Sequence, residues 1–408
     1  MDQFLKAVKI TDKVYWVGVI DWNLRNFHGY ITEAGSTYNA FLVIDEKITL
    51  IDTVKEPFYD QMMARIRSVI DPARIDYIVS DHSEMDHTGA LPLAIRDIKP
   101  EKVFASPNGE KNLNAQLKLG MDVTVVKTGD SVSIGKNKLQ FVQTQMLHWP
   151  DSMFTYLSDE KILFSQDAFG RHFACSKLFY DEHDRGQMEW EGEKYFANIL
   201  MPYSKQLLKL LEELPGLNLD IDYIFPDHGP LLRRPEDIAR TLELYRKWAE
   251  QKPLKRAIVI YDTMWHATER MTASIADGIR STGVDTEEIS VRHNNRSYVI
   301  TQLSRSGAIV AGSSTLNNNL LPSMADVLTY LRGLKPKNKI GFAFGSSGWS
   351  GEAVNQVAAY LTETSVELVN DGVTCKYSPS PEVLQACFEA GRELGMQLIS
   401  KVDSNSNQ

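Results

Sequence analysis

The pattern of strand-like and helix-like segments changes near residue 253, and this change constrains the fold more than any other feature of the sequence. The first part contains short β-type runs broken by turn residues, at 14–19, 40–44, 48–51, 77–80, 139–142 and 162–165. The second part alternates between strand and helix, with strands beginning near Ala257, Glu288, Ala308, Lys339 and Val366. Because these two patterns are typical of different architectures, the sequence predicts two domains, residues 1–252 and 253–408.

Each part then predicts its own fold class. Helical periodicity at 58–69 and 235–250, set among the hairpin-like runs, favours an αββα sandwich for the first domain. The strict alternation after the linker at 252–255 favours a doubly wound parallel sheet of five strands. A chain of 408 residues is long enough to bury both cores.

Composition limits the classes of partner and compartment. The formal net charge of -9 argues against nucleic acid, because phosphate contacts need clustered Lys and Arg. Cys175, Cys375 and Cys387 form no C-x-x-C pair, so neither a disulfide framework nor an iron–sulfur site is expected. We see no signal peptide and no apolar run near the ~20 residues of a membrane span, so we expect a cytoplasmic protein away from membranes.

A dense set of metal-ligand residues follows the strand that ends at Ser80. The segment 81–89 reads Asp-His-Ser-Glu-Met-Asp-His-Thr-Gly and places His82, Glu84, Asp86 and His87 on one loop. Three further candidates, His148, Asp167 and His228, each follow an apolar strand. A single histidine is more often structural, but a loop can aim several such neighbours at one point. Imidazole and carboxylate donors without a thiolate suit iron or manganese, and zinc less exclusively.

Three loops of the second domain predict a nucleotide site. The first, 262–268, is a hydroxyl-rich turn that opens a helix and can hold a phosphate with backbone N–H groups. It lacks the G-x-G-x-x-G pattern of a dinucleotide site and resembles the FMN phosphate loop of flavodoxins. The other two loops follow the third and fourth strands and converge on the same crevice of a doubly wound sheet. The predicted FMN-binding residues are Thr263, Met264, Trp265, His266, Ala267, Thr268, Ser313, Ser314, Thr315, Leu316, Asn317, Asn318, Ser346, Ser347, Gly348, Trp349 and Ser350.

The motif at 82–87 resembles the H-x-H-x-D-H loop of the metallo-β-lactamase superfamily, with Glu84 at the second histidine position. With the later His148, Asp167 and His228, the whole chain resembles the flavodiiron proteins. The resemblance implies that one iron is bound by His82, Glu84 and His148. It implies that the other iron is bound by Asp86, His87 and His228, and that Asp167 bridges the two. It also marks His28 and Tyr195 as residues near the metals.

The same resemblance implies an activity and its partners. A flavodiiron protein reduces dioxygen to water, or nitric oxide to nitrous oxide, at two irons that receive electrons from FMN. An external donor, rubredoxin or a reduced deazaflavin, would supply the electrons. The family arrangement is a head-to-tail homodimer, possible also as a homotetramer, in which each flavin faces the other subunit's irons.

The sequence also leaves two other functions open. A zinc hydrolase of the same fold with an accessory flavin domain would need no reductant, although a histidine at position 84 would then be expected. A non-enzymatic flavin electron carrier would require that the metal site had decayed, whereas all seven ligand-type residues are present. Metal and flavin analysis separates the three possibilities.

Overall fold

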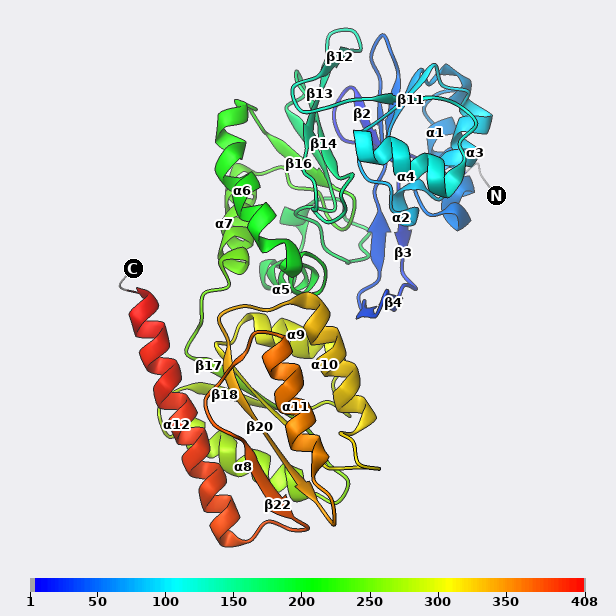
Figure 1. The fold of residues 1–408 in the computed structure, drawn as a ribbon. Coiled ribbons are helices and arrows are strands. Elements are labelled where there is room, and N and C mark those ends of the chain that lie inside the picture. Colours follow the sequence, from blue (N-terminus) through cyan, green and yellow to red (C-terminus); the bar gives the residue numbers. More distant parts are fainter. Residues whose placement is uncertain (1–3, 407–408) are drawn as a thin grey trace. The chain divides into compact units, whose positions relative to one another are not determined.

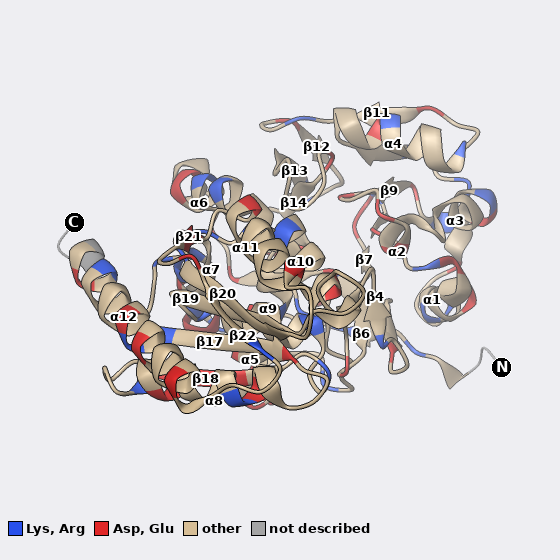
Figure 2. Cartoon of the chain, turned by 60° about the horizontal axis from the view of Figure 1, so that its bottom comes forward, with Lys and Arg blue, Asp and Glu red and all other residues tan. Residues whose placement is uncertain are grey.

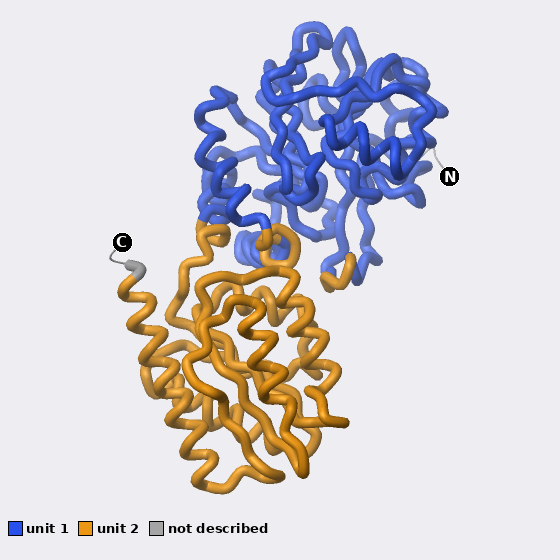
Figure 3. Tube along the Cα trace, in the orientation of Figure 1, with its two compact units in different colours: residues 1–27, 32–195, 203–246 blue, residues 28–31, 196–202, 247–408 orange. Residues whose placement is uncertain are grey.

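The computed structural model describes residues 4–406 and divides the chain into two compact units. Unit 1 comprises residues 1–27, 32–195 and 203–246, and unit 2 comprises 28–31, 196–202 and 247–408 (Figure 3). The main change of unit falls at residue 247, within helix α7 (Pro235–Glu250), slightly before the domain boundary that the sequence predicts at 252–253. Among the described residues, no helix is both long and apolar enough to span a bilayer.

Unit 1 contains two large sheets. The first has the order β1(Val8–Lys9), β2(Val14–Trp16), β7(Phe41–Val43), β8(Thr49–Ile51), β9(Tyr77–Val79), β10(Lys102–Ala105) and β11(Val123–Val125). The second has the order β12(Ser131–Ser133), β13(Lys138–Gln143), β14(Met153–Leu157), β15(Ile162–Gln166) and β16(Tyr223–Pro226). Two short ribbons complete the strands, β3(Val19–Asp21) with β6(Ser36–Tyr38) and β4(Asn26–Phe27) with β5(Tyr30–Ile31).

The central strands of the first sheet alternate between two apolar clusters. In β7, Phe41 and Val43 pack toward the second sheet, against Phe164 and Phe225, whereas Leu42 packs toward the helices. A strand buried on both faces in this way is expected only between two layers. The helices of unit 1 are α1(Tyr59–Arg67), α2(Met85–Thr88), α3(Leu91–Ile98), α4(Pro107–Leu117), α5(Arg185–Tyr195), α6(Ser204–Glu213) and α7. The predicted αββα sandwich is confirmed (Figure 1).

Unit 2 is built on one parallel sheet. Its strands are β17(Arg256–Asp262), β18(Asp285–Ser290), β19(Ala308–Ser313), β20(Ile340–Ser347), β21(Glu367–Leu368) and β22(Val373–Lys376). The order is β18-β17-β19-β20-β21, with β22 also beside β20, so the fifth predicted strand is split by the turn at Gly372. The helices are α8(Ala267–Arg280), α9(Arg296–Ser304), α10(Pro322–Leu334), α11(Glu352–Glu363) and α12(Pro381–Ser406). The doubly wound fold is confirmed.

The helices of unit 2 cover both faces of the sheet. Residues of α8 and α12 share one core with the central strands, while α9, α10 and α11 cover the opposite face (Figure 1). The approach of α8 to α12 is close, because a Cβ atom at Gly391 would lie 2.1 Å from the Ile275 carbonyl oxygen. Figure 2 shows charges of both signs along α12, with no basic stripe.

Candidate metal centre and flavin site

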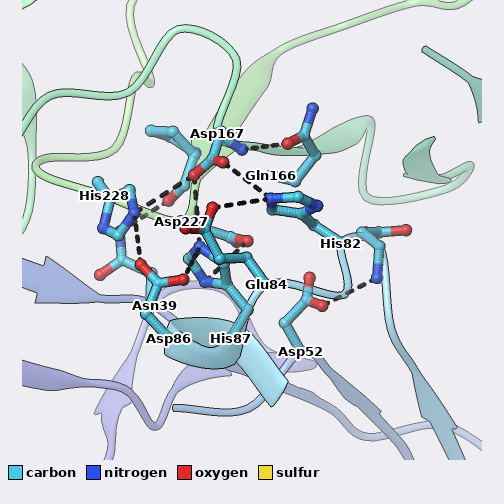
Figure 4. A network of polar contacts seen from close by, with 12 residues as sticks. Asn39, Asp52, His82, Glu84, Asp86, His87, Gln166, Asp167, Asp227 and His228 are labelled. Atoms are coloured by element: carbon cyan, nitrogen blue, oxygen red, sulfur yellow. Dashed lines mark hydrogen bonds and ion pairs between the residues drawn. The ribbon is translucent and has the colours of Figure 1, made fainter. Parts of the chain in front are cut away.

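The seven predicted metal-ligand residues come from both sheets of unit 1. His82 and Glu84 follow β9 in the first sheet, and Asp86 and His87 lie on the short helix α2 that comes next. The other three residues follow strands of the second sheet: His148 follows β13, Asp167 follows β15 and His228 follows β16. The structure brings all seven side chains together at the edge between the sheets. Figure 4 shows the arrangement of His82, Glu84, Asp86, His87, Asp167 and His228.

Their ligand atoms form two groups. One group contains His82, Glu84, His148 and Asp167, and the other contains Asp86, His87 and His228. His148 Nε2 lies 3.0 Å from Glu84 Oε2, and His228 Nε2 lies 3.3 Å from Asp86 Oδ2. Atoms that are each about 2.1 Å from one shared cation lie roughly 3.0–3.4 Å apart, so both groups have the spacing of a coordination shell.

Asp167 faces both groups. Its Oδ2 lies 3.2 Å from His82 Nε2 and 3.1 Å from His148 Nε2. Its Oδ1 lies 3.3 Å from the Nε2 atoms of both His87 and His228. The backbone directs this side chain inward, since Gln166 has a left-handed φ of 43° and its side-chain oxygen accepts from Asp167 N–H at 2.7 Å.

The burial of their carboxylate oxygens indicates whether these residues are suited to bind cations. Both carboxylate oxygens of Asp86 and Oδ1 of Asp167 are buried without a hydrogen-bond partner in the part of the chain that the structure describes. Buried carboxylates are costly unless a cation or donors compensate them. Two bound metal ions would supply that charge, so the residues present fit a metal pair.

The outer nitrogen of three ligand histidines faces an oxygen atom of another residue. His228 Nδ1 donates to the Thr37 carbonyl oxygen at 2.7 Å. His82 Nδ1 lies 3.4 Å from Asp151, and His87 Nδ1 lies 3.3 Å from Asp227. A proton held on Nδ1 leaves Nε2 as the electron-pair donor, which is the tautomer that a metal ion requires.

No motif in the sequence predicted these acidic partners. Asp151 and Asp227 lie far along the chain from the histidines they contact. Asp52 accepts from the Asp81 N–H at 2.9 Å. Burial, followed by the negative charge of Asp52, raises the pKa of the Asp227 carboxyl. Burial raises the pKa of Asp52 to about 7. Acidic side chains that are distant in the sequence therefore lie next to the metal ligands, and only the fold brings them there.

The two residues predicted near the metals occupy different environments. Tyr195 is fully buried, with its ring 5.2 Å from that of His172 and 6.1 Å from that of His228. Its hydroxyl has no hydrogen-bond partner among the described residues, and burial raises its pKa. His28 instead is exposed, at the left-handed turn between β4 and β5, and belongs to neither ligand group.

His172 is the histidine that packs beside the ligands, although the sequence suggested no role for it. Its ring lies 4.5 Å from that of His228, and its Nδ1 lies 2.8 Å from Ser36 Oγ. Burial, followed by the positive charge of His228, lowers its pKa, so the ring is neutral. Its position, five residues after Asp167 in the same loop, is the only sequence signal that could have marked it.

In unit 2, the three predicted loops surround a cavity of about 820 Å³. They follow β17, β19 and β20, whose parallel register places their carboxyl ends at one edge of the sheet. The predicted residues that line the cavity are Met264, Trp265, Ala267, Ser314, Thr315, Leu316, Asn317, Asn318, Ser346, Ser347, Gly348, Trp349 and Ser350. Tyr377 and Ser378 line it as well and were not predicted.

Four predicted residues do not line the cavity directly. Thr268 lies beneath it, where its Oγ1 meets the hydroxyls of Ser314 and Ser346 at 3.0 and 3.1 Å. Thr263 Oγ1 is buried without a partner among the described residues. Ser313 turns into the protein to accept from Leu321 N–H, and His266 is exposed and paired with Glu269. Hydroxyl groups at the start of α8 are suited to a phosphate, and the cavity is large enough for a flavin, so the residues fit FMN.

Comparisons with known proteins match both units of the chain. A family described as "ODP family beta lactamase" matches residues 37–229, and the flavodoxin family matches residues 259–391. The chain is 42% identical to a nitric oxide reductase of Moorella thermoacetica, over 96% of this chain and 99% of that protein.

Two solved structures are similar over nearly the whole chain. The rubredoxin oxygen:oxidoreductase of the anaerobe Desulfovibrio gigas superimposes with a TM-score of 0.95 at 40% identity, covering 97% of this chain and all of the other. The flavodiiron protein of Giardia intestinalis gives a TM-score of 0.94 at 34% identity, covering 98% and 99%. The whole-chain similarity, the two matched families and the paired ligand groups together show that this chain belongs to the flavodiiron protein family.

Proposed function

We propose that this protein is an oxidoreductase that reduces dioxygen to water, or nitric oxide to nitrous oxide, at two iron ions that receive electrons from FMN. The observation that carries the proposal is the Asp167 carboxylate, whose two oxygens face two separate ligand groups. Neither group contains a thiolate, and imidazole with carboxylate is a donor set suited to iron. The names of the similar Moorella and Desulfovibrio proteins support nitric oxide and dioxygen, respectively, as substrates.

Bound iron would supply the redox chemistry and bound FMN a store of electrons, while the protein supplies position and protons. His82, Glu84 and His148 would hold one iron, Asp86, His87 and His228 the other, and Asp167 both. His148 is the most exposed of these ligands, at 15%, so a small gas molecule can reach the centre beside it. Tyr195 retains its proton and can donate a hydrogen bond to a molecule bound near His228.

The proposal includes an external electron donor and a second subunit. The name of the Desulfovibrio protein supports rubredoxin as the donor, with a reduced deazaflavin as the alternative. Trp265 and Trp349 are 86% and 89% exposed at the flavin cavity, an exposure that a second copy of the chain would remove. We propose a head-to-tail homodimer, or a tetramer of such dimers, in the cytoplasm, where the three buried thiols would remain reduced.

Metal and flavin analysis followed by rapid mixing tests the activity. The purified protein should contain two irons and one FMN per chain, and its reduced form should be reoxidised by dioxygen or by nitric oxide without added enzyme. Two zinc ions and hydrolysis of an ester or lactam without a reductant would overturn the proposal in favour of a hydrolase. Flavin without metal would favour an electron carrier.

Complementation between two inactive variants tests the dimer. D167N removes the bridging carboxylate, and T268E places a negative charge where the FMN phosphate would bind. If each flavin serves the other subunit's irons, dimers reassembled from both variants should recover part of the activity. Sedimentation as a fully active monomer, or mixed dimers without activity, would contradict the arrangement.

A further inference from the structure

Tyr377 lines the flavin cavity from a fourth direction. It follows β22, whereas the three predicted loops follow β17, β19 and β20. Its sequence context, Lys376-Tyr377-Ser378-Pro379, contains no cofactor motif. Only the pairing of β22 with β20, in which Lys376 lies opposite Ser347, brings this residue beside the loop 346–350.

The backbone at Tyr377 is turned toward the cavity at an energetic cost. Its φ is 56°, in the left-handed region that bulky residues rarely adopt. The turn is held by the Tyr377 N–H, which donates to the Ser347 carbonyl oxygen at 2.8 Å. Left-handed residues other than glycine are strained and are concentrated at ligand sites.

The ring of Tyr377 lies along Gly348. A Cβ atom added to Gly348 would lie 3.4 Å from Tyr377 Cε1 and 3.8 Å from Cζ, which is ordinary van der Waals contact. The residue is nevertheless 69% exposed, beside the exposed Trp265 and Trp349. A large aromatic side chain held in place at a cavity wall, with most of its surface uncovered, is suited to pack against a planar ligand.

The position of the ring indicates which part of the ligand it meets. The hydroxyls suited to phosphate, those of Thr263, Thr268 and Ser314, gather at the start of α8. An extended FMN with its phosphate there would lay its ring system along the loops 315–318 and 347–350. Tyr377 adjoins the second of these loops.

We propose that Tyr377 is a further flavin-binding residue, whose ring packs against the isoalloxazine and disfavours its reduced form. The proposal rests on the proposed FMN function. An electron-rich aromatic ring in contact with the flavin opposes the gain of negative charge on reduction. Removal of the ring should therefore weaken FMN binding and raise the midpoint potential of the bound flavin.

Two substitutions separate the ring from the backbone. Y377G deletes the ring and accepts the left-handed φ without strain, so the variant should fold. Y377F keeps the ring and removes only the hydroxyl. Tyr360, which is half-buried on α11 against Arg332, provides the control variant Y360F in the same unit.

The test titrates the full-length apoprotein with FMN and follows flavin fluorescence, the visible spectrum and the midpoint potential. Y377G should raise the FMN dissociation constant by about tenfold and shift the potential upward, whereas Y377F and Y360F should match the wild type. An unchanged dissociation constant and potential in Y377G would overturn the inference alone. Failure of the wild-type chain to bind FMN would overturn the proposed function as well.

Discussion

The Asn39 side-chain amide donates to the Gly229 carbonyl oxygen at 2.9 Å, one residue beyond the ligand His228. The same amide donates to the Pro226 carbonyl oxygen at 2.7 Å, and its oxygen accepts from the Trp16 indole at 2.9 Å. Asn39 is fully buried. It therefore fixes the turn that presents His228 to the second ligand group without touching the metal site itself.

Replacement of Asn39 should loosen that turn. We expect N39A to weaken metal binding by about 10- to 100-fold, the usual effect of removing a group that orients a ligand. Metal content after dialysis against a graded chelator measures this. N137A is the matched control, because Asn137 is equally buried and bonded to Asp45, remote from the ligands in the sequence and the contact network. Equal metal retention in both variants would contradict the role.

Replacement of Asp167 should affect both metal ions together. In D167N, one bridging oxygen becomes an amide nitrogen that cannot bind a cation, so both ions should be lost together and the metal content should fall well below one per chain. D181N removes a buried carboxylate that pairs with Arg233 and should leave metal content unchanged. Loss of only one metal from D167N would show that the carboxylate belongs to a single site.

Removal of the metals should destabilise unit 1. Buried carboxylate oxygens of Asp86 and Asp167 have no hydrogen-bond partner among residues 4–406, so a bound cation would stabilise them. A ligand present at a thousand times its dissociation constant stabilises the folded state by about 4 kcal/mol. Calorimetry should show a lower melting temperature after chelation, restored by ferrous iron under anaerobic conditions. D167N should respond weakly to the same chelator, and a full response there would argue against site-specific binding.

The Tyr195 hydroxyl should matter for reaction more than for stability. Because it has no partner among the described residues, Y195F should leave the free energy of unfolding nearly unchanged. Reoxidation of the reduced protein by gas should slow about tenfold or more, since a proton donor is lost. Tyr245 provides the contrast: its hydroxyl donates to the Gly170 carbonyl at 3.0 Å, so Y245F should lose stability and keep its rate.

Lys339 should give unit 2 a pH-dependent stability. Its ammonium is buried and donates to the Ser306 carbonyl, and burial lowers its pKa from 10.5 to about 7. Between these values the unfolded chain binds more protons than the folded chain, so the free energy of unfolding rises with pH. The maximum slope for one group is about 1.4 kcal/mol per pH unit.

K339M removes this contribution. Urea titrations at pH 7 and pH 9 should show a smaller gain in stability for K339M than for the wild type. The variant leaves the Ser306 carbonyl without its donor, so the comparison uses the change between the two pH values and not the absolute stability. Parallel pH dependence in both proteins would mean that Lys339 is not titrating in this window.

The sequence was sufficient to predict the site residues that lie at the ends of strands. Each ligand residue follows a strand or lies in the loop 81–89, and such positions can meet at one edge of a layered fold. The resemblance to the flavodiiron proteins, and not the pattern alone, assigned His148 and Glu84 to one metal, and His148 Nε2 lies 3.0 Å from Glu84 Oε2. The sequence pattern did not predict the acidic residues that contact the ligand histidines, because Asp227 reaches His87 from the other sheet. Tyr377 was missed for the same reason, since strand pairing alone brings it beside Gly348.

Local motifs also leave the solvent exposure of a side chain undetermined. His28 and His172 each lie in a loop near apolar residues, and nothing in either segment tells which histidine is buried. In the structure, the packing of Phe27 encloses His172 at 4.9 Å, while the left-handed turn leaves His28 exposed. The fold, through Phe27, decides which histidine lies beside the ligands.

The distribution of ligands over both sheets of unit 1 has a consequence for biogenesis. His82 to His87 leave the ribosome long before His228. The first ligand group is complete at Asp167, but the second is not complete until His228, which follows the last strand of the second sheet. The nascent chain therefore cannot capture its iron pair during early synthesis. Loading must follow closure of the sandwich, and iron starvation should leave folded, empty protein that can be matured later.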